Sequence, residues 1–277
     1  MSQPETSDSQ HFEVVSSDDP GRRLQMAGTF NFRDVGGYPT ADGGQTRFGR
    51  LFRADALCYL DDRSRASLHD IGLRTVLDLR EDIERDSAPD ALQGLELNEV
   101  HVPVFGNTIY SASTGDRPDA TLQDLYALAL EKFAPQIVEA VGVLAADGAL
   151  PAVVHCSAGK DRTGMVVAIA LSAVGVPDEW VIADYAASES FLSGGFVEAL
   201  KSNFARAGIV QDVSNTATQS PPELIRYVLR TVREHYGSVL EFLNHHGVGE
   251  KSIDRLRSRL VLPAEEVAAL DNRGTDG

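Results

Sequence analysis

The chain has 277 residues, of which 43% are apolar and 24% charged, and this length and composition suit one domain with a substantial core. Its formal net charge of −16 argues against nucleic acid as a partner, so any anion must be bound by a local site. No apolar run is long enough for a membrane-spanning helix, and the first residues lack the apolar stretch of a secretory signal. We therefore expect no integral membrane association, and a cytoplasmic protein or one secreted without a conventional signal peptide.

Three segments are expected along the chain. Residues 1–23 open with many Ser, Asp, Gln and Glu residues and few large apolar ones, which predicts a flexible N-terminal tail. Residues 24–265 are expected to form a single domain. Residues 266–277 end in a polar run and are expected to form a flexible C-terminal tail.

The first half of the domain predicts short strands and one clear helix. Residues 24–53 are dense in Gly, Asp and Thr, which favours tight turns and a small antiparallel edge. Residues 61–71 begin with two aspartates suited to a helix N-cap and stop before Gly72. Residues 75–79 are apolar and β-branched, and residues 99–104 alternate, so both predict strands.

The second half alternates helices with one buried strand. Apolar residues from Leu122 to Phe133 recur at helical spacing, and Pro135 restarts the helix. A short strand, 152–155, precedes a helix over 163–173 that is apolar on every face and so belongs in the centre of the domain. Further helices are predicted from Pro177 onward and over 223–235, 239–245 and 253–260.

This alternation of strands with long helices predicts an α/β fold with a largely parallel central sheet flanked by helices. The mixed segment 188–222 contains Gly194 and Gly195, and we expect it to be a mobile, helical, lid-like insertion.

The run from His155 to Gly164, called here the phosphate loop, carries the strongest chemical signal. A strand that runs into a glycine-containing loop and then a helix aims backbone N–H groups and the positive helix end at one point, which suits a phosphate. The predicted phosphate-binding residues are Ser157, Ala158, Gly159, Lys160, Asp161 and Arg162.

Cys156 opens the loop, where unpaired N–H donors favour a thiolate that can attack phosphorus. The planar fork of Arg162 can hold two phosphate oxygens and neutralise charge in the transition state. Thr163 could hydrogen-bond the sulfur and help it leave, and His155 could orient Cys156 from behind.

This run closely resembles the signature loop of the protein tyrosine phosphatase superfamily, and its Lys160-Asp161 pair is similar to the atypical bacterial members that act on phosphotyrosine and phosphoinositides. Asn31–Gly37, Phe52–Leu57 and Gly72–Arg80 resemble N-terminal motifs of the same family. The resemblance implies a tyrosine-phosphatase-like fold and a phosphocysteine intermediate on Cys156. It also implies inorganic phosphate as a product and neither a metal nor any other cofactor.

We favour Asp161 as the general acid, with Asp78 as a second carboxylate that could act in its place. Asp161 stands where a glycine is usual, and no Trp-Pro-Asp segment occurs to supply an acid. The resemblance suggests Asp161, or Asp78 at the end of its strand; the step requires an acid within hydrogen-bond reach of the leaving oxygen. Asp161 could instead form a salt bridge to a neighbour, and Asp78 could pair with Arg80 or order the loop.

Lys160 is linked by the resemblance to phosphoinositide acceptance, although a solvated surface lysine would also explain it. Arg33 and Asp34 could line the same mouth or form a turn salt bridge. The expected substrates are phosphotyrosine proteins, with phosphoserine, phosphothreonine and phosphoinositides left open.

Three other functions would use part of this sequence pattern. A phosphate-reading pseudophosphatase would lose the nucleophile or the arginine, and both are present. A thiol redox protein would need a resolving cysteine, and only Cys58 is available, with a Cys58–Cys156 disulfide left open. A sulfur-transfer or arsenate-handling enzyme would not need Asp161 and Thr163 together.

Overall fold

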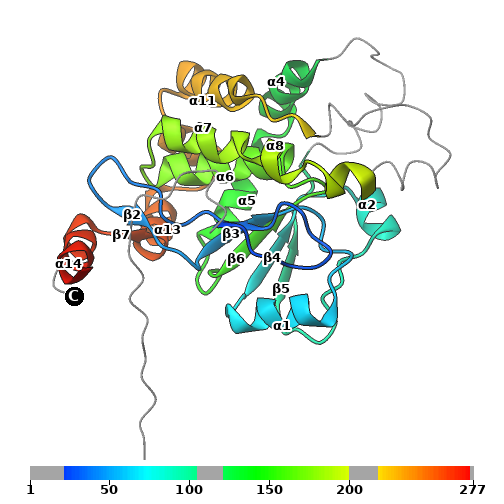
Figure 1. Ribbon diagram of the computed structural model, residues 1–277. Coiled ribbons are helices and arrows are strands. Elements are labelled where there is room, and N and C mark those ends of the chain that lie inside the picture. Colours follow the sequence, from blue (N-terminus) through cyan, green and yellow to red (C-terminus); the bar gives the residue numbers. More distant parts are fainter. Residues whose placement is uncertain (1–21, 105–120, 200–217, 275–277) are drawn as a thin grey trace, which may run out of the picture.

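The structure is a computed structural model that describes residues 22–104, 121–199 and 218–274 (Figure 1). Its central sheet has the order β1-β3-β6-β4-β5, and a two-stranded sheet pairs β2 with β7. The bounds of the strands are β1 Arg33–Asp34, β2 Gln45–Thr46, β3 Leu51–Ala54, β4 Thr75–Asp78, β5 Asn98–His101, β6 Ala152–His155 and β7 Val261–Leu262.

The central sheet is parallel except at one edge, as the sequence predicts. Strands β3, β6, β4 and β5 pair in parallel, and β1 joins β3 antiparallel. The predicted antiparallel edge in residues 24–53 is therefore confirmed as β1, while β3 from the same region enters the parallel core.

Helices cover both faces of this sheet. Their bounds are α1 Asp62–Asp70, α2 Asp82–Ser87, α4 Leu122–Lys132, α5 Ala134–Leu144, α6 Asp161–Ala173, α7 Asp178–Ala186, α8 Ser188–Phe191, α11 Pro222–Tyr236, α12 Val239–His245, α13 Glu250–Leu260 and α14 Ala264–Gly274.

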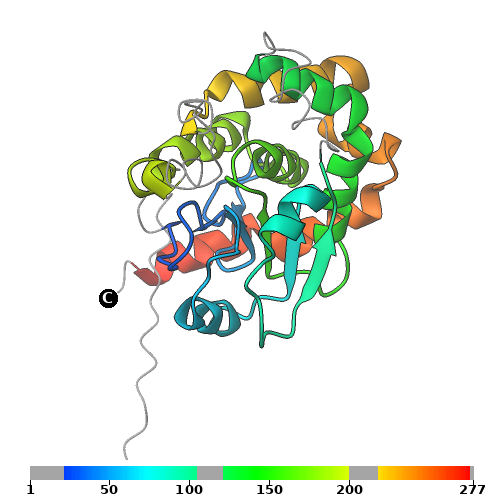
Figure 2. The same cartoon turned by 90° about the vertical axis from the view of Figure 1, so that its right-hand side faces the viewer.

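Alternate residues of each central strand point to opposite faces, because side chains in a strand have a period of two. Val76 and Val153 pack with α1 in a smaller core, whereas Leu77 and Val154 join the larger core under the other helices. Figures 1 and 2 show α1 alone on one side of the sheet and the long helices on the other.

The central helix is α6, which follows β6 directly. Every residue from Arg162 to Leu171 is buried, as the uninterrupted apolar run predicts. This burial ties the first turn of α6, and with it the phosphate loop, to the most rigid part of the domain.

Several predicted boundaries change. Arg22 and Arg23 were expected in the flexible tail, but Arg22 is 1% exposed with its guanidinium 3.9 Å from the Tyr38 ring centroid, and Arg23 forms a β-bridge to Arg33. The C-terminal tail expected from residue 266 instead includes α14, whose first turn is stabilised by bonds from the amides of Glu266 and Val267 to the Pro263 carbonyl.

Some predictions lie partly outside the described residues. The rest of the N-terminal tail, 1–21, is one, and so is most of the expected lid-like insertion, 200–217. Among the helices that the structure describes, none has the length and apolar character needed to cross a membrane.

Candidate functional site

The phosphate loop lies at the carboxyl end of the parallel sheet. His155, the last residue of β6, sits between Ala54 of β3 and Asp78 of β4 in the strand register. Residues that follow β3 and β4 therefore emerge beside the loop, which is the edge where open α/β sheets bind ligands.

Side chains from distant parts of the chain hold the loop from behind. Arg53 Nη2 donates to the Gly159 carbonyl at 2.7 Å, and Asn31 Nδ2 donates to the carbonyls of Ala158 and Gly159 at 2.9 and 3.1 Å. With these carbonyls turned backward, the backbone N–H groups of Ser157, Ala158 and Gly159 donate to no described residue. The loop thus has the form of an anion cradle.

Buried charges fix the arginine that supports the loop. Asp184 accepts from Arg53 Nη1 at 2.5 Å and from Arg33 Nε at 3.3 Å, and both arginines are fully buried. Burial by itself would raise the pKa of Asp184, but the two arginine charges outweigh it and lower this pKa to about 2. Arg33 therefore does not line the mouth, and Asp34 accepts instead from the amides of Gly36 and Gly49.

Cys156 and Arg162 lie together in the floor of the loop. The exposed fraction of Cys156 is only 3%, and that of Arg162 is 7%. Burial acts to lower the pKa of Arg162, but a hydrogen bond to Glu84 and the neighbouring charges of Cys156 and Glu84 raise it above its ordinary value. The guanidinium is therefore charged beside the sulfur at any physiological pH.

Glu84 on α2 contacts Ser157 and Arg162 of the phosphate loop, and the sequence did not identify Glu84 as a site residue. Its carboxylate accepts from Nη1 and Nη2 of Arg162, the second at 2.8 Å, and from the Ser157 hydroxyl. No described residue hydrogen-bonds to Nε of Arg162. The Nε side of the fork is thus left for an oxyanion, while Glu84 holds the opposite edge.

Asp161 begins α6 and is partly open to solvent, with 28% of its side chain exposed. Its Oδ1 accepts from the Tyr126 hydroxyl at 2.7 Å, and its Oδ2 lies 3.4 Å from Nζ of Lys160. Lys160 is 1% exposed and also donates to the Gln219 carbonyl at 2.8 Å, so the alternative of a solvated surface lysine is wrong.

Asp78 is held in a buried network rather than presented to the loop mouth. Arg80 donates to both of its oxygens, at 3.0 and 2.8 Å, and Arg85 donates at 3.1 Å. Burial would raise the pKa of Asp78, but the hydrogen bond from Arg80 and the charges of His155 and Arg80 outweigh it and lower this pKa. The pairing of Asp78 with Arg80, one of the alternatives from the sequence, is present.

His155 joins the same network, with Nε2 3.2 Å from Asp90 Oδ2. Asp78, Asp90 and His155 are the one group among the described residues whose spacing could hold a metal ion. Arg80 Nη2 already lies 2.8 Å from Asp78 and 2.9 Å from Asp90, so a cation balances both carboxylates.

One smaller expectation differs from the structure, and one open alternative is decided by it. The Thr163 hydroxyl is buried and has no hydrogen-bond partner among the described residues, so the expected bond to the Cys156 sulfur is not formed. Cys58 and Cys156 are both free thiols, and no disulfide joins them.

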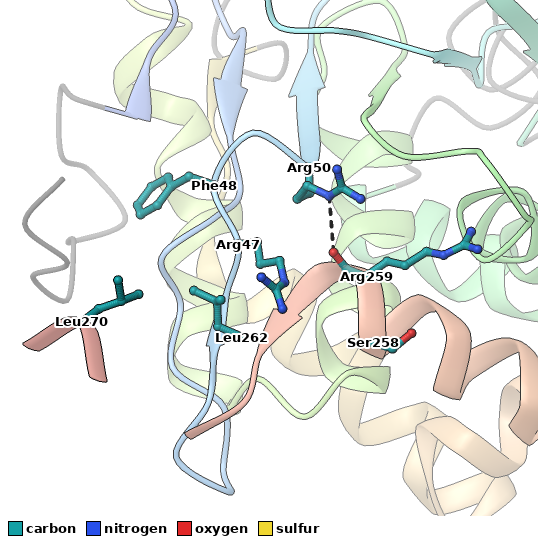
Figure 3. Close-up of a pocket in the computed structure, with 7 residues that line it drawn as sticks. All are labelled: Arg47, Phe48, Arg50, Ser258, Arg259, Leu262 and Leu270. Carbon is teal, nitrogen blue, oxygen red and sulfur yellow. Dashed lines mark hydrogen bonds between the residues drawn. The ribbon is translucent and has the colours of Figure 1, made fainter. Parts of the chain in front are cut away.

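A second opening lies far from this site, lined by Arg47, Phe48, Arg50, Ser258, Arg259, Leu262 and Leu270 (Figure 3). Arg47 and Arg50 precede β3, at the amino end of the strands, and Arg259 lies near the end of α13, whereas the phosphate loop follows the carboxyl end of β6. Arg50 donates to the Arg259 carbonyl at 3.4 Å, and Arg259 pairs with Asp147 at 2.6 Å. These cations therefore take no part in the phosphate loop.

The sequence reading missed Glu84, Tyr126, Asp184 and the roles of Asn31 and Arg53. Asn31 and Arg53 lie inside the motifs that carry the family resemblance, and Glu84 follows β4 at the same sheet edge as the loop, so a signal existed for these three. Tyr126 and Asp184 lie on predicted helices, but no sequence pattern singled out either residue.

Comparison with known proteins indicates the same family as the phosphate loop does. The sequence model of the tyrosine phosphatase family matches residues 24–262. The triple specificity protein phosphatase PtpB of Mycobacterium tuberculosis is 30% identical, over 86% of this chain and 98% of that protein. A putative tyrosine-protein phosphatase of Cupriavidus necator is 29% identical, over 77% of this chain and 80% of that protein.

Among solved structures, TpbA of Pseudomonas aeruginosa overlaps 61% of this chain and 96% of its own, with 16% identity and a TM-score of 0.29, too low to bear on the fold. The family match, by contrast, spans every strand and the whole phosphate loop. The chain belongs to the tyrosine phosphatase family.

Proposed function

We propose that the protein hydrolyses phosphomonoesters through a phosphocysteine on Cys156, without a metal. One observation carries the proposal: a buried cysteine shares its loop with an arginine whose fork is held at one edge by Glu84, while its Nε bonds to none of the residues that the structure describes. In the first step the Cys156 thiolate attacks phosphorus, the bond from phosphorus to the leaving oxygen breaks, and that oxygen takes a proton from Asp161. In the second step water attacks phosphorus, Asp161 accepts its proton, and the sulfur leaves with release of inorganic phosphate.

Asp161 is favoured over Asp78 as the general acid. Asp78 is bound on both oxygens by arginines and has a lowered pKa, which makes it a poor proton donor. Asp161 is partly exposed at the helix start, within the loop itself. Ser157 to Arg162 would hold the phosphate, with Lys160 as a second buried cation and Thr163 near the sulfur.

We further propose phosphotyrosine proteins as substrates, with phosphoserine, phosphothreonine and phosphoinositides as additional ones. The support is the relative named as a triple specificity phosphatase, together with the buried Lys160 beside Asp161. A matched panel of phosphopeptides and phosphoinositides would rank these classes.

The test uses 4-nitrophenyl phosphate. Turnover should survive EDTA and be blocked by vanadate, because the loop supplies all the positive charge that the transition state needs. Cys156→Ser should abolish turnover and keep phosphate binding, with Cys58→Ser as the matched control that retains activity. Activity in Cys156→Ser, or its loss in EDTA, would contradict the proposal.

A further inference from the structure

Tyr126 of α4 reaches the start of α6 and contacts Asp161. Its hydroxyl lies 2.7 Å from Asp161 Oδ1 and 2.8 Å from the Tyr185 hydroxyl. Tyr126 is 1% exposed and Tyr185 is fully buried, and their rings meet edge to face at 6.3 Å. A chain of hydroxyls therefore leads out of the core and ends on one carboxyl oxygen.

The direction of this chain is determined by chemistry. Burial, and then the charge of Asp161, raise the pKa of Tyr126 well above its ordinary value, so the phenol stays protonated and donates. Burial and Asp161 raise the pKa of Tyr185 in the same way, which leaves Tyr185 able to donate in turn to Tyr126. Asp161 Oδ1 is then the acceptor at the end of the chain.

The Tyr126 bond anchors Oδ1, so Oδ2, which forms an ion pair with Lys160, is the oxygen that would carry the proton. Oδ2 of Asp161 lies on the side of Lys160 Nζ, 3.4 Å away, and the side chain is partly exposed. An unanchored aspartate at a helix start could turn toward solvent or cap its own helix. The Tyr126 bond excludes those rotamers, because a buried phenol held by a second phenol has little freedom to follow.

We infer that Tyr126 is a positioning residue for Asp161, holding Oδ1 so that Oδ2 delivers the proton to the leaving oxygen, with Tyr185 fixing Tyr126. This rests on the proposed function, in which Asp161 is the general acid. Tyr126 itself does not touch the reacting atoms. Its effect should therefore depend on how much the leaving group needs a proton.

Two substrates with different leaving groups distinguish a positioning role of Tyr126 from a purely structural role. 4-Nitrophenolate leaves without a proton, whereas the phenolate of phenyl phosphate benefits from one. For Tyr126→Phe we expect kcat/KM to fall about tenfold on phenyl phosphate and less than about threefold on 4-nitrophenyl phosphate, the scale of one lost hydrogen bond. Vanadate affinity should stay unchanged, since Cys156, Arg162 and the backbone amides of the loop keep their contacts.

A double-mutant cycle supplies the decisive comparison. Asp161→Asn should itself reduce kcat/KM mainly on phenyl phosphate, and adding Tyr126→Phe should then have no further effect, because both changes remove the same proton delivery. Tyr236→Phe is the matched control, since its hydroxyl bonds to His246 at 3.2 Å, away from the loop. It should retain wild-type kinetics on both substrates.

The outcomes distinguish the two proposals. If the wild-type protein turns over neither substrate, the proposed function fails. If the wild type is active but Asp161→Asn shows no leaving-group dependence, the assignment of the acid fails and this inference with it. If Asp161→Asn behaves as expected but Tyr126→Phe slows both substrates equally, or adds its full effect to Asp161→Asn, only the role of Tyr126 is overturned.

Discussion

The carboxylate of Glu84 forms an ion pair with the guanidinium of Arg162, with Oε1 2.8 Å from Nη2. Burial would raise the pKa of Glu84, but the hydrogen bond and charge of Arg162 and the bond from Ser157 outweigh it and lower this pKa to about 2. Because no residue of α2 is buried, the Glu84–Arg162 ion pair connects this helix to the phosphate loop without apolar packing from α2. Glu84 thereby orients the arginine that would meet the phosphate.

Glu84→Gln should lower kcat/KM for 4-nitrophenyl phosphate about tenfold, because a neutral amide replaces one charge-assisted bond and pairs poorly with the fork. Steady-state kinetics and vanadate inhibition would measure the loss. Glu266→Gln is the control, since that carboxylate pairs weakly with Arg47 at 3.5 Å on the far side of the molecule. Faster turnover in Glu84→Gln would contradict this role and mark the carboxylate as a competitor of the substrate.

Gly159 is required by the closeness of the loop to β3. Its φ is +66°, and a Cβ there would lie 2.2 Å from the Ala54 carbonyl oxygen. Gly159→Ala should therefore displace the loop and reduce kcat/KM about a hundredfold, the cost of a misplacement near 1 Å. Circular dichroism would check that the fold persists.

Gly148 provides the matched comparison, because its φ is +76° and a Cβ there would meet nothing within 4 Å. Gly148→Ala should cost about 1–2 kcal/mol of unfolding free energy through backbone strain alone. Its activity should equal that of the wild type. Equal kinetics for the two variants would show that contact with Ala54 does not shape the loop.

Asp55 predicts a pH dependence of stability. It accepts from the amides of Phe30 and Asn31 at 2.9 to 3.0 Å, yet burial dominates and raises its pKa to about 6. Between pH 4 and 6 the folded state keeps a proton that the unfolded state, with an ordinary aspartate pKa near 4, releases. The unfolding free energy should therefore fall as pH rises through this window.

Denaturant titrations at several pH values would measure this slope for the wild type and for Asp55→Asn. The variant has no carboxyl to titrate at this position, so its slope between pH 4 and 6 should be shallower. Asp62→Asn serves as the control, because 95% of the Asp62 side chain is exposed. An Asp55→Asn slope equal to that of the wild type would assign the dependence to other groups.

Elements with a strong local pattern were predictable. The helix after Asp61 begins and ends where its cap and Gly72 indicate, and the all-apolar run after the loop is the buried α6. The buried face of α4 was predicted less accurately. Its buried residues are Tyr126 and Ala129, whereas Leu122 and Leu125 are only partly buried. The buried face of a helix is predicted from the spacing of its apolar residues, and this spacing does not identify a tyrosine whose hydroxyl bonds to a buried polar partner.

The candidate site divides in the same way. Cys156, Asp161 and Arg162 were identifiable because they share one short loop whose geometry follows from strand, turn and helix. The partners that hold this loop lie 35 to 106 residues away along the chain: Tyr126 on Asp161, Glu84 on Arg162, and Arg53 on Gly159.

The sequence alone therefore determined the chemistry of the loop and the order of the elements, because both depend on neighbours in the chain. Only the tertiary structure decided which carboxylate is partly exposed at the loop and which is buried among arginines. Asp78 and Asp161 are the same residue type, and what separates them is the set of charges and phenols that folding brings within 3 Å.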